Sequence, residues 1–499
     1  MAGQTTGPPP AGRCRTNRFA VVGAGEPVSV VFGIGAQCRS EGEPRESDRP
    51  PMTATDVAMN PARVVRAYLV ISGLFTLSAS VIWAVNTLFL LDSGLNIFQV
   101  FIANSAFTVG TVLFEIPTGV VADTAGRRRS FLLSTVTLMV GTLAYVAISI
   151  WGGGLLLFSI ASMVLGVGFT FYSGAVEAWL VDALRATGYE GQLDAIFARG
   201  SMVSGAAMLI GSVGGGLLGT IDLAWPYVVR AGLLGAAFVV GFNVMHDIGF
   251  TPRATSLSLL PDELRTVLRT SLAFGWNRPS LRLLMIVSVF QSAFMMWGFY
   301  AWQPYFLELI GHDAVWVAGV VSALIALATI AGNAVVEFVA RFCGRRSTVL
   351  FASTIVGAVG AVGVGLADSF WPSVALLLLA IAAMGVATPV QQAYVHEVVP
   401  SAERATVVSF ISMVGSGGGI GGPIGLGYLS RVQSVATGYV AGGLTTLLAL
   451  PPILLLRGLR EPADTIVGRK AGKRGPCAAQ GLPDVATIDA IARQPEPVR

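Results

Sequence analysis

Between roughly residue 66 and residue 458, apolar runs of about 20 residues alternate with short polar loops, and this alternation is the strongest constraint on the fold. A helix of that length crosses the hydrocarbon core of a bilayer. We predict spans near 66–91, 97–122, 130–151, 155–183, 195–219, 223–248, 283–309, 314–340, 348–367, 372–399, 406–430 and 436–457. The sequence therefore predicts an all-α membrane protein with twelve transmembrane helices.

Composition excludes the main alternatives. The 499-residue chain is 54% hydrophobic and 12% charged, whereas soluble proteins carry about 25% charged residues. A soluble globule is thereby excluded, and so is disorder over most of the chain, because disordered segments lack this apolar surface. No two of the four cysteines form a CxxC pair, so we predict neither a disulfide framework nor a metal site.

The placement of basic residues predicts the orientation. Of the 32 Lys and Arg residues, only Arg230 and Arg431 lie away from the two tails and the loops on their side of the membrane. Basic residues mark the cytoplasmic side. We therefore expect both termini in the cytoplasm and the chain in the cell (inner) membrane.

We divide the chain into five parts. The tails are too polar or too broken by Gly and Pro to form spans, and we expect them to be disordered; the N-terminal tail includes a possible alternative start at Met52. An amphipathic segment that begins at Pro261 predicts an interfacial helix in the central linker. The parts are a disordered extension (1–62), an N-terminal six-helix bundle (63–250), a cytoplasmic linker (251–282), a C-terminal six-helix bundle (283–458) and a disordered tail (459–499).

An internal repeat relates the two bundles. An offset of 218 residues places Gly126, Arg127 and Arg128 on Gly344, Arg345 and Arg346 (344 − 126). It also aligns polar faces of the second and eighth spans, pairing Asn104, Thr108, Thr111 and Glu115 with Ser322, Ala326, Thr329 and Asn333. Many secondary transporters consist of two such repeats.

The loop after the second span carries a specific resemblance. The segment from Gly119 to Arg128 resembles the signature G-x-x-x-D-[RK]-x-G-[RK]-[RK] of the major facilitator superfamily, except that Thr124 replaces a basic residue. In the second copy Arg341 replaces the aspartate. The resemblance implies twelve helices, alternating access and a gating role for the first copy, in which Asp123 contacts the start of span eleven. The gating residues are Gly119, Asp123, Gly126, Arg127 and Arg128.

The fifth span resembles the glycine-rich motif of drug and proton antiporters in that family. Gly211, Gly215 and Gly216 match the motif, whereas Ala207 and Ser212 replace its first Gly and its Pro. Close helix packing also explains these small residues. The usual span-four arginine of these antiporters is Ser162 here, so its coupling role is not transferred.

Ionisable residues within spans are costly and suggest proton sites. Glu115 lies about 12 Å inside the second span, and Glu177 ends a polar face of the fourth span that includes Ser162, Gly166, Thr170 and Ser173. Arg199 of the fifth span would pair with Glu177 or Asp182. The proton-coupling candidates are Glu177, Glu115, Asp182 and Arg199, and the alternative for them is a fixed ion pair that only positions helices.

Aromatic and amide residues on the first, fourth, seventh and tenth spans predict a substrate cavity, because small-molecule sites combine apolar walls with a few polar groups. The candidates are Trp83, Asn86, Phe169, Tyr172, Gln291, Met295, Trp302, Gln391 and Tyr394.

These features predict a secondary active transporter, not an enzyme, that exports a small, fairly apolar molecule in exchange for protons. A proton-coupled importer of a sugar or other metabolite is the alternative, and a transporter-like receptor or membrane-embedded enzyme comes next. The expected partners are the substrate, protons and the lipid bilayer. We expect a monomer without a cofactor. We expect no nucleotide site, because the GxGxxG strings at Gly214 and Gly417 lie inside apolar spans, and no nucleic-acid partner.

Overall fold

The computed structural model describes residues 60–466, except 190, 192, 253–268, 270, 311–314 and 400–403. Within these residues, 12 helices are long and apolar enough to cross a membrane. The described backbone has no strand beyond one isolated bridge between Arg345 and Thr465. The predicted all-α membrane fold is therefore confirmed.

Within the described residues, the N-terminal bundle contains eight helical segments in chain order. They are α2 (Pro61–Ser80), α3 (Asn86–Asp92), α4 (Ile97–Ala125), α5 (Arg127–Trp151), α6 (Gly154–Tyr172), α7 (Ala175–Ala186), α8 (Leu193–Gly219) and α9 (Trp225–Val244).

The C-terminal bundle follows after the partly described linker. It contains η3 (Ser271–Trp276), α11 (Pro279–Ile310), α12 (Val315–Ala334), α13 (Val336–Cys343), α14 (Arg346–Leu366), α15 (Phe370–Val398), α16 (Arg404–Val432), α17 (Val435–Leu447), α18 (Leu450–Gly458) and η4 (Pro462–Asp464).

Local sequence explains where the first long helices begin. Asn60 precedes α2, accepts a hydrogen bond from Ala62 N at 3.0 Å, and is followed by Pro61, which lacks the amide hydrogen that would be unpaired there. At α4, Asn96 and Gln99 form a capping box in which each side chain accepts a hydrogen bond from the other residue's backbone amide.

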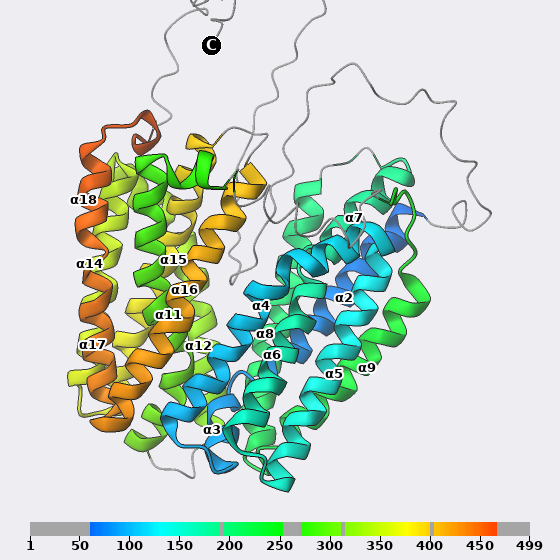
Figure 1. The fold of residues 1–499 in the computed structure, drawn as a ribbon, viewed down its shortest axis with the longest axis horizontal. Coiled ribbons are helices and arrows are strands. Elements are labelled where there is room, and N and C mark those ends of the chain that lie inside the picture. Colours follow the sequence, from blue (N-terminus) through cyan, green and yellow to red (C-terminus); the bar gives the residue numbers. More distant parts are fainter. Residues whose placement is uncertain are drawn as a thin grey trace, which may run out of the picture.

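The two bundles stand side by side, and α4 crosses toward α16 between them (Figure 1). We call the end of the bundles where α2 begins and α18 finishes the tail end, and the opposite end the far end. All four hydrogen bonds that join the bundles within the described residues lie toward the far end, from Ser105, Thr87 or Gln303. The bundles therefore meet closely at the far end.

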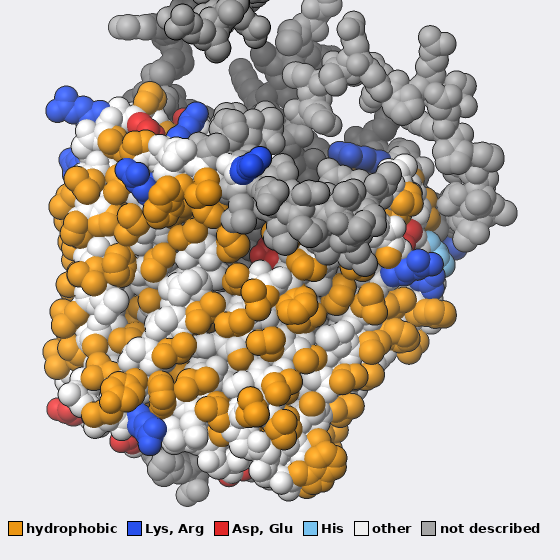
Figure 2. Space-filling model, viewed as in Figure 1, with side chains coloured by type: hydrophobic (Ala, Val, Ile, Leu, Met, Phe, Trp, Pro, Cys, Tyr) orange, Lys and Arg blue, Asp and Glu red, His pale blue; other side chains and the backbone are white. Residues whose placement is uncertain are grey.

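The outer surface fits a lipid environment. Hydrophobic side chains cover the flank visible in Figure 2, while most of the charged side chains there lie toward its two ends. In an 18-residue stretch of each candidate span, between 33% and 50% of the residues are buried within the protein, so a large share of every span is at least partly exposed. A flank this apolar would be unfavourable in water and is favourable in a bilayer.

Four predicted spans are interrupted, which corrects the expectation of unbroken helices. The first span breaks at 81–85, the eighth at Val335 and the twelfth at 448–449. The fourth breaks at Ser173 and Gly174, where Gly174 has φ 75°, a conformation that glycine adopts without a side-chain clash. The predicted single polar face from Ser162 to Glu177 is therefore wrong, since α6 and α7 are separate helices.

The C-terminal boundary also differs from the prediction. Residues 459–466, which we assign to the disordered tail, are described and pack against the bundle. Ala463 and Asp464 are buried, and Ile466 N donates to Gly344 O at 3.0 Å. The predicted interfacial helix at Pro261 and the extension before residue 60 lie outside the described residues.

Candidate transport machinery

The C-terminal bundle contains a cavity of about 150 Å³ between α11, α14, α15 and α17. Its lining combines hydroxyl and amide groups with apolar side chains and includes no ionisable residue. The lining residues are Ser288, Gln291, Ser292, Phe294, Met295, Ser353, Thr354, Gly357, Ala383, Met384, Ala387, Thr388, Gln391 and Thr446. This wall suits an uncharged ligand that forms some hydrogen bonds.

Two amides lie on facing helices of this cavity. The Gln391 side chain on α15 donates from Nε2 to Ser288 Oγ on α11 at 2.7 Å. Gln291 lies one helical turn after Ser288, and both residues line the cavity. Met295 of the same helix also lines it and is 44% exposed, so the cavity lining reaches the protein surface there.

Gln291, Met295 and Gln391 are the predicted cavity residues found in this lining; the other candidates lie elsewhere. Trp302 and Tyr394 are buried, and the Tyr394 hydroxyl faces Glu461 at 3.4 Å.

The N-terminal candidates pack against their own bundle or against the far-end contact. Tyr172 stacks on Phe75 with ring centroids 3.4 Å apart, and Phe169 lies 6.0 Å from Phe107. Asn86 donates from Nδ2 to Asn104 Oδ1 at 3.0 Å, and Trp83 O accepts from Gln303 Nε2 at 2.6 Å.

The predicted gating residues form an ion pair and bind the end of α9. Asp123 Oδ1 lies 2.5 Å from Arg127 Nη1. Arg128 N, at the start of α5, donates to Asp247 Oδ1 at 2.8 Å, so a carboxylate sits where the helix dipole is positive. Gly126 has φ 105°, and a Cβ on it would collide with Asp247 Oδ2. Glycine at this place in the motif therefore leaves room for Asp247.

The second copy of the loop repeats this arrangement. At the start of α14, Ser347 N donates to Asp464 Oδ1 at 2.7 Å, and Ser347 Oγ donates to Asp464 Oδ2 at 2.9 Å. Arg346 also pairs with Glu397 of α15.

Sequence reasoning missed both capping acids, Asp247 and Asp464. They follow the residues that they cap by 119 and 117 positions, so the repeat offset could have found them once one was known.

The proton-coupling candidates do not form one cluster. Glu115 is half-buried on α4, and Glu177 lies in the first turn of α7, where the helix N-terminus favours a negative charge. Asp182 interacts electrostatically with Arg127 and Arg185 near the gating loop. Arg199 is exposed, and within the described residues it pairs with neither Glu177 nor Asp182.

The expected contact between Asp123 and the start of α16 falls on side chains outside the described set, since the side chains of residues 401–406 are not described.

The glycine-rich part of α8 packs closely against two neighbours, the segment after α2 and helix α12. A Cβ on Gly215 would meet Val81 O, and one on Gly216 would lie 2.7 Å from Gly319 of α12. The glycines of this motif thus permit close backbone contact within and between the bundles.

Comparisons with known proteins identify the fold. A family model described as Major Facilitator Superfamily matches residues 68–341 and 317–494. Sequence comparison with curated proteins gives no match. Among solved structures, the chain is similar to the nucleoside transporter NupG, with 13% identity over 80% of this chain and 99% of that chain and a TM-score of 0.67.

Two further structures share the fold at low identity. The D-xylose-proton symporter is 13% identical over 81% of this chain and 99% of that chain, with a TM-score of 0.58. The human organic anion transporter MFSD10 is 17% identical over 79% of this chain and 100% of that chain, with a TM-score of 0.53.

Proposed function

Because the chain belongs to the Major Facilitator Superfamily and is a secondary active transporter, we propose that it exports a small, uncharged, fairly apolar molecule in exchange for protons. The observation that carries the substrate class is the cavity of the C-terminal bundle. Its lining has eight hydroxyl or amide side chains and no ionisable one. A charged substrate entering this cavity would lose its hydration without gaining an ion-pair partner.

Proton coupling is proposed for the N-terminal bundle. Glu115, Glu177 and Asp182 are acidic residues within its candidate spans, and the cavity of the other bundle has none. We assign the coupling proton to Glu177, since it lies at the break between α6 and α7, where movement of the two segments would change its surroundings. Glu115 and Asp182 are the alternative sites.

The proposed direction, export, rests on the resemblance of α8 to the glycine-rich antiporter motif. Import of a sugar or other metabolite with protons is the second candidate, and the cavity gives it support. The amides of Gln291 and Gln391, together with the surrounding hydroxyls, could bind a polyhydroxylated molecule.

We propose that the tail end faces the cytoplasm of a cell (inner) membrane, and that the gating loop closes this end during the cycle. The close contact of the bundles at the far end supports a conformation that is closed there. Rocking of the two bundles would then expose the two sides in turn.

The test uses the full chain in proteoliposomes with an imposed pH gradient and a panel of uncharged drugs, nucleosides and sugars. Export by antiport predicts that substrate accumulates in the compartment that is more acidic. Accumulation in the more alkaline compartment would establish symport and replace the first candidate by the second. Uphill movement without any pH dependence would contradict proton coupling.

A further inference from the structure

The cavity of the C-terminal bundle has an open mouth and a buried floor. Met295 and Thr388 line it and are exposed, so they mark the mouth. The hydroxyl side chains of Ser353, Thr354 and Thr446 line it and are buried, so they belong to the floor. A cavity of about 150 Å³ holds one small ring. A ligand would therefore place one compact group in the cavity, and any larger part would extend through the mouth.

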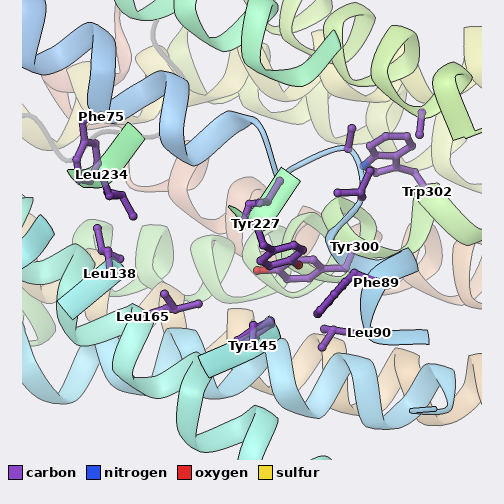
Figure 3. Close-up of a cluster of buried hydrophobic side chains, with 14 of the residues drawn as sticks. Phe75, Phe89, Leu90, Leu138, Tyr145, Leu165, Tyr227, Leu234, Tyr300 and Trp302 are labelled. Atoms are coloured by element: carbon purple, nitrogen blue, oxygen red, sulfur yellow. The ribbon is translucent and has the colours of Figure 1, made fainter. Parts of the chain in front are cut away.

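The matching interior of the N-terminal bundle is filled. The residues that the two acids cap, Arg128 and Ser347, are 219 positions apart (347 − 128). The same offset pairs Leu138 of α5 with Gly357 of α14 (357 − 138). Leu138 belongs to the cluster of buried side chains in Figure 3, to which α2, α5, α6 and α9 contribute. Gly357 lines the cavity instead, and a Cβ on it would meet no atom closer than 3.8 Å. The shared frame therefore does not require the cavity.

The hydroxyl groups of this cavity share one hydrogen-bonding state. Five of the six donate to a backbone carbonyl one turn earlier in their own helix: Ser288 to Leu284 at 2.9 Å, Ser353 to Val349 at 2.7 Å, Thr354 to Leu350 at 2.8 Å, Thr388 to Met384 at 3.1 Å and Thr446 to Gly442 at 2.9 Å. A hydroxyl has one hydrogen and two lone pairs. These five groups therefore have no free hydrogen for a ligand, and their oxygens are available as acceptors.

The Gln391 amide adds a further acceptor. Its Nε2 donates to Ser288 Oγ at 2.7 Å and lies 3.5 Å from Leu284 O, so its hydrogens are directed to α11. Within the described residues its Oε1 has no partner. The two other polar side chains of the lining, Gln291 and Ser292, form no hydrogen bond within the described residues and keep their hydrogens. The cavity thus offers many acceptors and few donors.

We propose that the cavity binds a compact, uncharged group that carries at least two N–H or O–H donors, such as a urea, a primary amide or a diol. The donors of this group bind the oxygens of the wall, and Gln291 donates to its acceptor. This inference rests on the proposed function, because it takes the cavity as the substrate site. It adds the chemical group that this site recognises.

A group that only accepts hydrogen bonds should bind poorly. An ether, an ester or a tertiary amide of the same size displaces water from the wall oxygens and gives them no hydrogen in return. It could gain a donor from one of the five hydroxyls only if that hydroxyl broke its bond to its own helix. Both routes lower the affinity, so the cavity discriminates by donors as well as by size.

The experiment measures binding without a gradient, so its result does not depend on the direction of transport or on proton coupling. The full chain, with its four cysteines replaced by serine, carries Met295→Cys at the mouth and is labelled with a maleimide in detergent. The probes are 2-imidazolidinone, a cyclic urea with two N–H donors, and 1,3-dimethyl-2-imidazolidinone, which keeps the ring and the carbonyl but has no donor. We expect 2-imidazolidinone to slow labelling at an about tenfold lower concentration.

A third probe separates donors from size. Tetrahydropyrimidin-2-one is one methylene larger than 2-imidazolidinone and keeps both N–H donors, so it should protect Met295→Cys at a similar concentration. No protection by 2-imidazolidinone, or equal protection by the dimethyl compound, overturns the proposal. If the larger cyclic urea protects as poorly as the dimethyl compound, size alone decides binding and the proposal is also overturned.

Two substitutions locate the effect in the cavity. Thr354→Val keeps nearly the same shape, removes one acceptor and should raise the half-protecting concentration of 2-imidazolidinone by about 3–10-fold. The control is Thr135→Val, at the repeat-related threonine in the filled interior, which is 1% exposed and donates to Leu132 O at 2.8 Å. This control should bind as the parent does. Gly357→Leu copies the N-terminal bundle and should abolish protection.

The second substitution keeps the proposal falsifiable if Thr354→Val does not fold. Unchanged protection in Thr354→Val or in Gly357→Leu overturns the proposal. A donor preference in this assay, combined with uphill transport that ignores pH, would refute the proposed proton coupling and leave this inference intact. Proton-coupled transport without any donor preference would refute this inference alone.

Discussion

The two bundles share one frame and differ in where they carry charge. In each bundle an acid from the segment that follows the sixth span caps the helix after the signature loop, Asp247 at α5 and Asp464 at α14. Only the N-terminal bundle has acids well inside its described spans, at Glu115 and Glu177, and a buried arginine at Arg230. The C-terminal bundle instead has a neutral polar cavity.

We propose that the duplicated frame holds the helices, while the residues that differ between the copies carry the separate tasks. The acids well inside the spans and the buried arginine lie in the N-terminal bundle. Groups that can bind an uncharged molecule lie in the other. Substitutions in the shared frame should therefore affect stability, whereas those in the differing residues should affect coupling or binding separately.

The largest expected effect on stability comes from the shared caps. Asp464 is 2% exposed and binds through both oxygens, so Asp464→Ala leaves Ser347 N and Oγ unpaired and costs about 2–3 kcal/mol. Asp247 is half-buried and accepts one hydrogen bond from Arg128 N, so Asp247→Ala costs about 1 kcal/mol. Thermal unfolding midpoints in detergent measure both changes. A larger shift for Asp247→Ala than for Asp464→Ala would contradict the prediction that the C-terminal cap contributes more to stability.

A smaller effect is expected at the cavity. Gln391→Ala removes an amide that donates to Ser288 Oγ and lines the cavity, and it should weaken substrate binding about tenfold. The dependence of transport on pH should not change, since the substituted residue is not ionisable. Equilibrium binding of labelled substrate is the measurement, with Gln433→Ala, at an exposed position after α16, as the control. Equal binding by both variants would place the substrate outside this cavity.

A substitution in the gating loop should change the ratio of forms open at the tail end to forms closed there by a few-fold. Asp123→Asn removes the ion pair with Arg127 and weakens closure of the tail end, so forms open at that end should increase. Cysteines introduced on each side report this by their rate of labelling, and Asp92→Asn at the far end is the control. An unchanged labelling pattern with normal transport would remove Asp123 from the gate.

The smallest effect is expected for the N-terminal extension. A chain that begins at Met52 should insert and transport as the full chain does, because both proposed tasks lie after residue 60. Quantitative immunoblotting of membranes and transport per molecule are the measurements. A several-fold fall in the membrane level or in transport per molecule would show that the extension has a role in insertion or transport.

The twelve spans and the repeat were predictable, because the length of the apolar runs and the spacing of matching motifs are properties of the sequence alone. The break at Gly174 was not, since one Gly inside an apolar run is also compatible with a continuous helix. This break changes the setting of Glu177 from the end of a helical face to the first turn of a new helix.

Contacts between residues far apart in the sequence could not be predicted either. Asp464 follows Arg460 in a polar segment, and contacts with residues more than 100 positions earlier, such as Ser347, show that it belongs to the bundle. Similarly, the sequence predicts both Trp302 and Gln391 as cavity residues, but the structure places only Gln391 in the lining. Which face of an apolar helix meets a cavity depends on its neighbours, and a single sequence does not supply them.

The division of tasks between the bundles is tested most directly by Glu177→Gln. This variant mimics the protonated carboxyl and cannot release a proton, while the cavity of the C-terminal bundle is unaltered. In proteoliposomes it should exchange labelled substrate across the membrane at a normal rate without a gradient, yet fail to accumulate substrate when a pH gradient is imposed. Accumulation at the normal rate would contradict the account and leave Glu115 or Asp182 as the coupling residue.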